Sequence, residues 1–431
     1  MRAFLDSLFF AFTNFVLKRA IKKYLVLESS EIHTLPPARK SKPYLLYIHI
    51  PFCHTLCVYC SFNRFLFNEQ KARKYFQSLR REIALIHQLG YDFDSIYVGG
   101  GTTSIMLDEL LATLHYAKEL FPNITHISCE SDPNHISPQE LQSLKGIVDR
   151  LSIGVQSFDD GILAKIGRLE KFGDGASLQA RLKHTKNTLP IINVDLIFNF
   201  PNQTQAMLMR DIEIVKSLNP TQITFYPLMS STLTHSLITR TLGKASHDQE
   251  QTFYHLITQA MSDEYEQVSA WAFSKKQDDV FDEYIVQNDE YIGVGSGSFS
   301  FLDGTLYVNT FSLKKYSQCL EQGGDIPQQG AIERKKHFSF KSQMQYRLMV
   351  GLFGGKIHLP SFNAHFHTNL SRVCFFEILF LRFWGMVKKQ GAYLITTPKG
   401  RYLFLRLQKE FYIGMDNIRE QSRATLNDED M

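Results

Sequence analysis

The sequence predicts an α/β fold, a partial parallel (βα)6 barrel followed by a C-terminal helical, winged-helix-like cap domain. Short runs of β-branched and aromatic residues alternate with longer amphipathic stretches, which is typical of strand–helix–strand crossovers and a parallel sheet. The alternation stops after the sixth run, whereas a closed barrel of this kind needs eight units. The chain has 431 residues, of which 44% are hydrophobic. A chain of this length can bury a sufficient core without disulfide bonds.

Residues 1–42 are expected to precede the barrel as an amphipathic helix and a linker. The stretch "SLFFAFTNFVL" (residues 7–17) is shorter than the roughly 20 apolar residues that span a bilayer, and basic residues follow it where a signal-peptide cleavage site should be. We expect it to pack on the protein; the alternative is peripheral membrane contact through its phenylalanines. The proline-rich stretch "HTLPPARKSKP" (residues 33–43) is interpreted as the linker. Without an export signal, we expect the reducing cytoplasm.

The barrel is expected over residues 43–232, with an extension of the catalytic domain over residues 233–334. Between the first two runs, apolar residues at positions 76, 79, 83 and 86 predict a helix that Gly90 can end. Leucines from position 110 to 120 predict the next helix, and Thr204 can cap a helix running to Leu218. The six predicted strands begin at Tyr44, Ser95, Thr125, Arg150, Ile192 and Gln222.

Residues 335–431 are expected to form a separate C-terminal domain. "FKSQMQYRLMVGLF" (residues 340–353) is amphipathic, and residues 375–404 predict a helix followed by a strand pair around "TTPKG" (residues 396–400). A helix followed by a basic hairpin is typical of a winged helix, which can bind DNA. The formal net charge of +4 is too small to indicate nucleic acid by itself.

Unusual residues fall at the ends of the predicted strands. A cysteine-rich loop follows the first strand and "GGGTTS" follows the second. Loops at the carboxyl ends of parallel strands share one face, where active sites form. The periodicity therefore predicts one pocket that gathers these two loops and the polar residues of the later strands, which are Glu130, Asp132, Gln156, Asp195 and Tyr226.

The cysteine-rich loop, "YIHIPFCHTLCVYCSF", holds three of the six cysteines in a C-x3-C-x2-C pattern: Cys53, Cys57 and Cys60. One interpretation is that they are buried small hydrophobes, but their polar surroundings disfavour it. A second is a zinc site assisted by His49 or His54, but no second cysteine pair follows. The third is an iron–sulfur cluster with one iron left open to a small molecule, and we favour it.

This cysteine spacing, in the loop after the first strand of a βα fold, resembles that of the radical S-adenosylmethionine (SAM) enzymes. "GGGTT", "CESDP", "SIGVQSF", "IGR" and "VDLIFNFP" follow in order. The series resembles the oxygen-independent coproporphyrinogen III oxidase family over roughly residues 44–227, and more loosely through "YIGVGSGSFSF" (residues 291–301). In that family a small helical domain covers the substrate cleft, so we expect residues 335–431 to act as a cap and not to bind nucleic acid.

The resemblance implies a [4Fe–4S] cluster and SAM as cofactors. Cys53, Cys57 and Cys60 would hold the cluster, and its open iron would bind SAM. The positions that match the binding site of this SAM are Tyr47, Gly100, Gly101 and Glu130, while Tyr59 would lie beside a bound adenosyl group. Alone, Glu130 could instead cap the next helix. The positions that match a second SAM site are Gln156, Arg168 and Asp195; for the last two, the alternative is an ion pair at the barrel mouth.

The resemblance further implies an enzyme of porphyrin metabolism. Reduced by a donor such as flavodoxin or ferredoxin, the cluster would cleave SAM to a 5′-deoxyadenosyl radical that takes hydrogen from a tetrapyrrole, and coproporphyrinogen III would be decarboxylated. In the oxidases, however, a fourth cysteine stands where this chain has Phe62. Anaerobic haem-degrading methyltransferases also lack that cysteine, so haem modification or ring opening is the alternative. A haem chaperone is the non-enzyme alternative, although "DEYIVQNDEYIG" (residues 282–293) lacks the chaperones' histidine–asparagine motif.

Overall fold

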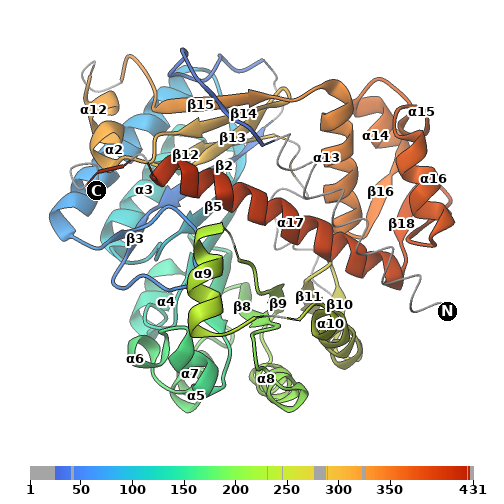
Figure 1. The fold of residues 1–431 in the computed structure, drawn as a ribbon. Coiled ribbons are helices and arrows are strands. Elements are labelled where there is room, and N and C mark those ends of the chain that lie inside the picture. Colours follow the sequence, from blue (N-terminus) through green and yellow to red (C-terminus); the bar gives the residue numbers. More distant parts are fainter. Residues whose placement is uncertain are drawn as a thin grey trace.

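The computed structural model describes residues 25–39, 43–230, 232–244, 246–275, 288, 290–322, 327–424 and 426–427 (Figure 1). The helix expected at residues 7–17 and most of residues 282–293 lie outside the described residues. Among the described helices, none combines the length and the apolar character needed to cross a membrane.

Most of the described strands form one large mixed sheet with a parallel centre. Its order is β1-β15-β14-β13-β12-β2-β5-β6-β7-β8-β9-β11-β10. Its six central strands pair in parallel, which confirms the predicted strand order and direction. They are β2 (Tyr44–Ile50), β5 (Phe93–Gly100), β6 (His126–Ser131), β7 (Arg150–Gln156), β8 (Ile191–Phe198) and β9 (Gln222–Pro227).

Helices connect these parallel strands. In α2 the predicted stripe is buried at Phe76, Leu79 and Ile83, and Gly90 follows the helix with a φ of 84°. In α8 the Thr204 hydroxyl accepts a hydrogen bond from the backbone N–H of Met207, and the helix ends at Leu218 as expected. The connecting helices are α2 (Glu69–Gln88), α3 (Leu107–Leu120), α4 (Pro138–Leu144), α5 (Asp160–Lys165), α6 (Leu169–Phe172), α7 (Gly175–Lys183) and α8 (Gln205–Leu218).

The extension widens the same sheet at both sides. After α9 (Thr232–Thr241) and α10 (His247–Met261), β10 (Tyr265–Gln267) and β11 (Ala272–Lys275) pair antiparallel beyond β9. At the other side, β12 pairs in parallel with β2, and the remaining strands continue antiparallel. The elements on that side are β12 (Tyr291–Val294), β13 (Phe299–Leu302), β14 (Thr305–Asn309), α12 (Leu313–Glu321), β15 (Ile332–His337) and β1 (Glu28–Ser29). The expected domain boundaries stay predictions, and the one at residue 334 falls within β15.

The C-terminal region is helical with a small three-stranded sheet, β16-β18-β17. The strand pair turns at Gly391 and Ala392, so placing it around "TTPKG" was wrong. Thr397 instead caps the last helix by accepting a hydrogen bond from the Gly400 N–H, and Pro398 occupies the first helical turn, where its missing N–H costs nothing. The elements are α13 (Phe340–Phe353), β16 (Lys356–His358), α14 (Leu359–His365), α15 (Leu370–Val373), α16 (Phe375–Phe383), β17 (Val387–Gln390), β18 (Tyr393–Thr396) and α17 (Pro398–Arg423).

The C-terminal region shares its core with the large sheet. Trp271, beside β11, is fully buried, and its ring centroid lies 4.6 Å from that of Phe353 in α13. Helix α17 then crosses in front of the sheet toward β12 and α2 (Figure 1). This crossing brings the last helix to the carboxyl ends of the parallel strands.

Candidate active site

A cavity of about 330 Å³ lies at the carboxyl ends of the central strands. The structure brings all eleven residues that the sequence singled out into its lining, although they come from six separate segments of the chain. They are Tyr47, Cys53, Cys57, Tyr59, Cys60, Gly100, Gly101, Glu130, Gln156, Arg168 and Asp195. Their roles stay predictions.

The cysteine loop is held at both ends and from inside. It begins at β3 (Phe52–Cys53), which pairs in parallel with β4 (Phe65–Leu66) after the loop. Inside it, the Arg64 guanidinium donates hydrogen bonds to the carbonyls of Cys57 (2.8 Å) and Cys60 (2.5 Å). The six cysteines of the chain form no disulfide bonds. Burial raises the pKa of the Cys53 thiol to about 11. The loop therefore offers three thiols at one edge of the cavity.

The donor set fits an iron–sulfur cluster better than a single ion. Within the described ranges, no three side chains of His, Cys, Asp or Glu are placed to hold one metal ion, so the zinc alternative gains no support. In a four-iron cluster each thiolate binds its own iron, which suits three cysteines spread along a loop.

The glycine turn after β5 lies against the cysteine loop. A Cβ on Gly101 would stand 2.5 Å from the Phe52 carbonyl oxygen and 2.9 Å from the Cys53 sulfur. Gly100 has a φ of 124°, which favours glycine. The turn is fastened by hydrogen bonds from the Gly101 N–H to the Ile50 carbonyl (2.8 Å) and from the Thr102 N–H to the Phe52 carbonyl (2.7 Å). Only glycine leaves this close approach open.

Glu130 faces the same turn from the end of β6. Its carboxylate accepts hydrogen bonds from the Gly100 N–H (3.1 Å) and the Tyr97 hydroxyl (3.0 Å). The next helix, α4, is capped by Ser137 with Glu140. The expectation that Glu130 could cap that helix is therefore wrong, and its carboxylate faces the cavity.

Tyr47 stands beside this turn on β2. Its hydroxyl lies 3.0 Å from Nδ1 of His49, whose Nε2 lies 2.9 Å from the Asn63 carbonyl. Burial lowers the pKa of His49 to about 4, so the ring is neutral near pH 7. The neutral ring can donate to the Asn63 carbonyl and accept from Tyr47, which links the wall of the cavity to the end of the cysteine loop.

Gln156, Arg168 and Asp195 line the cavity from β7, the start of α6 and β8. Arg168 is 5% exposed and donates hydrogen bonds to the Gly154 carbonyl and to the Tyr59 hydroxyl (3.1 Å). Its Nε is buried without a hydrogen-bond partner. Asp195 accepts hydrogen bonds from Ser152 and Asn193, both at 2.7 Å. Gln156 has a φ of 76°, an unusual conformation for a residue other than glycine. The contacts of Arg168 and Asp195 to other groups do not support the alternative of an ion pair between them.

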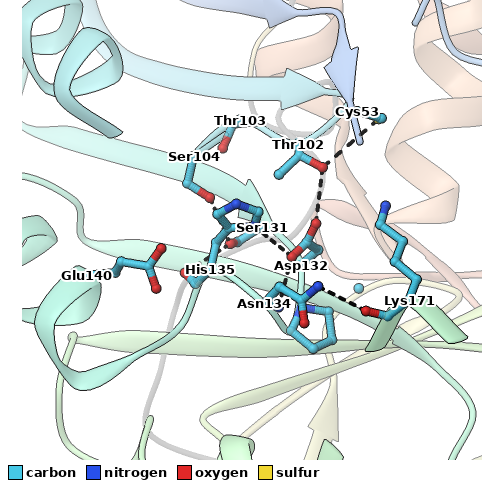
Figure 2. A network of polar contacts seen from close by, with 12 residues as sticks. Cys53, Thr102, Thr103, Ser104, Ser131, Asp132, Asn134, His135, Glu140 and Lys171 are labelled. Carbon is cyan, nitrogen blue, oxygen red and sulfur yellow. Dashed lines mark hydrogen bonds and ion pairs between the residues drawn. The ribbon is translucent and has the colours of Figure 1, made fainter. Parts of the chain in front are cut away.

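A polar network behind Cys53 was not predicted from the sequence (Figure 2). The Thr102 hydroxyl lies 4.0 Å from the Cys53 sulfur and 3.1 Å from Oδ2 of Asp132. Oδ1 of Asp132 is 2.8 Å from Nδ1 of His135. Burial acts to raise the pKa of Asp132, but the hydrogen bond and charge of His135 outweigh it and lower the pKa. For His135, burial acts to lower the pKa, and Asp132 outweighs it and raises the pKa. Of the Asp132–His135 pair, the sequence analysis named only Asp132, as a polar residue at the end of a strand.

The last helix also reaches the cavity, which sequence reasoning missed. Tyr412, Asp416 and Arg419 of α17 contribute to its lining. The Arg419 guanidinium lies 4.8 Å from the centroid of the Phe62 ring and 2.6 Å from the Asp416 carboxylate. Arg423 donates hydrogen bonds to the carbonyls of Phe62 (3.2 Å) and Arg64 (3.1 Å). In the sequence, the spacing of positions 412, 416 and 419 indicates that these residues share one helix face. It does not indicate which part of the protein that face contacts.

Comparison with known proteins identifies the family. Residues 47–215 match the radical SAM superfamily. Heme chaperone HemW of Bacillus subtilis is 30% identical over 64% of this chain and 76% of its own length. Oxygen-independent coproporphyrinogen III oxidase of Helicobacter pylori is 26% identical over 77% of this chain and 78% of its own.

A solved structure shows the same fold. Coproporphyrinogen III oxidase (HemN) from Escherichia coli aligns with a TM-score of 0.70 over 88% of this chain and 91% of its own, at 22% identity. The chain belongs to the radical SAM superfamily, among relatives named heme chaperone HemW and oxygen-independent coproporphyrinogen III oxidase, and its cofactors are a [4Fe–4S] cluster and SAM.

Proposed function

We propose that the chain is a radical SAM enzyme of porphyrin metabolism that removes hydrogen from a tetrapyrrole, as an oxygen-independent coproporphyrinogen III oxidase does. The observation that carries the proposal is the single cavity, which three cysteines, a glycine turn and two sets of polar residues line together.

Cys53, Cys57 and Cys60 would hold the cluster as thiolates. When bound, the cluster and SAM supply the hydrogen-abstracting chemistry, and the protein supplies orientation and exclusion of solvent. The Arg64 guanidinium fixes two carbonyls of the loop, so the sulfurs of Cys57 and Cys60 are held in place from behind. The Thr102 hydroxyl has a single proton, which it can donate either to the Asp132 carboxylate or to the sulfur of Cys53.

The glycine turn and Glu130 would hold the SAM at the cluster. Gly100 and Gly101 line the cavity, and without a Cβ they let the turn pack directly against His49 and the start of the cysteine loop. The Glu130 carboxylate lines the cavity and can accept hydrogen bonds from ribose hydroxyls. Tyr47 would pack beside this SAM, and Tyr59 beside an adenosyl group.

Gln156, Arg168 and Asp195 would bind a second SAM. The unpartnered Nε of Arg168 is a buried donor, which a carboxylate of a ligand can satisfy. Asp195 can accept further hydrogen bonds because a carboxylate has about four acceptor positions.

A haem chaperone is the second candidate function, and one specific observation favours it. The Bacillus subtilis relative, which is 30% identical, is named a heme chaperone. In addition, Phe62 lines the cavity beneath Arg419, at the position of the fourth cysteine of the oxidases. Phenylalanine cannot transfer hydrogen, so the oxidase proposal requires another group to take that part.

Anaerobic product analysis tests the proposal. The protein, loaded with its cluster and reduced by dithionite, is incubated with SAM and either coproporphyrinogen III or haem, and Cys57→Ala serves as the inactive control. Release of 5′-deoxyadenosine that coproporphyrinogen III stimulates, with vinyl products, supports the oxidase-like enzyme. Stimulation by haem with an altered tetrapyrrole would instead assign haem modification. Stoichiometric binding of unchanged haem without stimulation would assign the chaperone. Placing cysteine at position 62 (Phe62→Cys) then asks whether the missing thiol limits the reaction.

A further inference from the structure

The outer face of α16 is a stripe of large apolar side chains in solvent. Phe376 is 76% exposed and Phe383 is 81% exposed, while Phe375 and Leu379 are each about half exposed. Positions 375, 379 and 383 follow one another at one-turn spacing, and 376 lies next to them on the same side of the helix. Figure 1 shows α16 at the edge of the molecule that is farthest from the green elements α4–α8. No residue of α16 is among those that line the cavity, so this stripe is a separate surface.

The opposite face fixes α16 firmly to the protein. Leu381 is 8% exposed, and the Glu377 carboxylate is 2.6 Å from the Gln345 amide and 3.2 Å from the Lys341 ammonium, both of which belong to α13. These contacts fix which face of α16 is turned toward the protein. The exposed phenylalanines therefore lie on the face that is turned toward solvent. The helix has two apolar faces, and only one of them is used within the described residues.

The surroundings of the stripe are strongly basic. Residues 370–399 contain five basic residues and one acidic residue, so this segment alone carries a net charge of +4, equal to that of the whole chain. The one acidic residue is Glu377, which is already paired with Lys341. Four of the five basic residues are exposed, namely Arg372, Arg382, Lys388 and Lys389. Tyr393, on the hairpin formed by β17 and β18, is also 41% exposed.

We propose that α16 and the adjoining hairpin dock on an anionic membrane surface. Exposed phenylalanines surrounded by lysine and arginine match the chemistry of a bilayer interface, where the apolar side chains enter the boundary of the acyl chains and the cations meet lipid phosphates. Nucleic acid would attract the cations but offers little to two phenylalanines standing in solvent. A second copy docked face to face would place two clusters of positive charge together. An anionic membrane surface binds both the exposed apolar side chains and the surrounding positive charges.

Vesicle binding by the full chain tests this proposal. The protein is sedimented with vesicles of phosphatidylcholine alone and of phosphatidylcholine mixed with phosphatidylglycerol. We expect binding to the mixed vesicles that weakens with added salt. The double variant Phe376→Ser/Phe383→Ser should partition at least about tenfold less, because each phenylalanine loses its apolar transfer free energy. Lys388→Glu/Lys389→Glu should weaken binding to the mixed vesicles only.

Matched controls keep the result specific to this surface. Ile32→Ser removes an apolar side chain that is 56% exposed elsewhere, and it should leave vesicle binding unchanged. Circular dichroism and iron content should be the same in every variant. The proposal fails if the full chain does not sediment with mixed vesicles, or if Phe9→Ser/Phe12→Ser abolishes binding while the α16 variants do not. It also fails if the α16 variants instead abolish binding to a DNA duplex or concentration-dependent dimerisation.

Discussion

Replacing Gly101 with alanine adds a single methyl group to the glycine turn. We expect this change to disrupt the cluster site. The new Cβ would stand 2.5 Å from the Phe52 carbonyl oxygen, and real Cβ contacts are essentially never shorter than 3.0 Å. Backbone must therefore move by at least about 0.5 Å, the difference between these two distances. The Cys53 sulfur, at 2.9 Å from the new Cβ, lies in the path of the same movement.

The size of this shift decides what is lost. Metal–ligand distances tolerate only about 0.2 Å, so Cys53 should lose its coordination if it moves together with the adjacent Phe52 carbonyl, which must shift by about 0.5 Å. Overpacking of this kind also costs about 1–3 kcal/mol of folding stability. We expect Gly101→Ala to fold, with a lower denaturation midpoint, and to retain much less iron than the wild type.

Iron and acid-labile sulfide per chain, measured after anaerobic reconstitution, check this expectation. Gly161→Ala is the matched control, since Gly161 is helical and its new Cβ would meet only one side-chain oxygen, Oδ1 of Asp159, at 3.1 Å and no backbone atom. Full iron content and unchanged SAM affinity in Gly101→Ala would refute the inferred role of the turn.

Three other predictions address the cysteines, the ribose contact and the polar network. Alanine at any cysteine of the loop should reduce iron from about four per chain to traces, whereas Cys129→Ala and Cys319→Ala should retain it in the same metal analysis. Glu130→Gln should keep the cluster but weaken SAM binding by about 10- to 150-fold in equilibrium titration, since a charge-assisted hydrogen bond contributes about 1.5–3 kcal/mol; an unchanged Kd would contradict this. The Asp132–His135 pair should stabilise the fold most between about pH 4 and 6.5. The contribution of Asp132, whose pKa is lowered, is lost as pH falls below that window, and that of His135, whose pKa is raised, is lost as pH rises through its folded-state pKa. Chemical denaturation should show that His135→Asn has a lower free energy of unfolding than the wild type, with the largest difference in that pH window. A difference that does not change with pH would contradict the prediction.

Much of the parallel sheet could be predicted because its signals are local. Periodicity, a capping threonine and a terminating glycine act within one helix or strand, and β2 and α8 have the bounds that the sequence indicated. The hairpin of the C-terminal region was misplaced because the Thr-Pro pair of "TTPKG" is both a turn signal and a helix start. The short sequence alone cannot distinguish a hairpin turn from the start of a helix.

What the sequence could not predict depends on contacts between distant segments. The strands of the extension join both sides of the central sheet, but nothing within a strand specifies which neighbour it will pair with. The hydrogen bond from Arg423 to the Arg64 carbonyl joins positions 359 residues apart. Likewise, the network of Asp132, His135 and Thr102 exists only because β5 and β6 are adjacent.

The contacts of α17 limit what the barrel motifs alone can say about the reaction. The match to the radical SAM superfamily ends at residue 215, yet Arg419 covers Phe62 and Arg423 binds the carbonyls on either side of Asn63. The resemblance to the oxidases implies that Phe62 replaces their fourth cysteine. We therefore expect the residue that separates the candidate reactions to be one that contacts a part of the chain outside the superfamily match. A substrate entering the cavity must meet Tyr412, Asp416 and Arg419 as well as the barrel residues. We therefore expect the choice between oxidase, haem modification and chaperone to depend on α17 together with the cysteine loop, because relatives with different names share the barrel motifs.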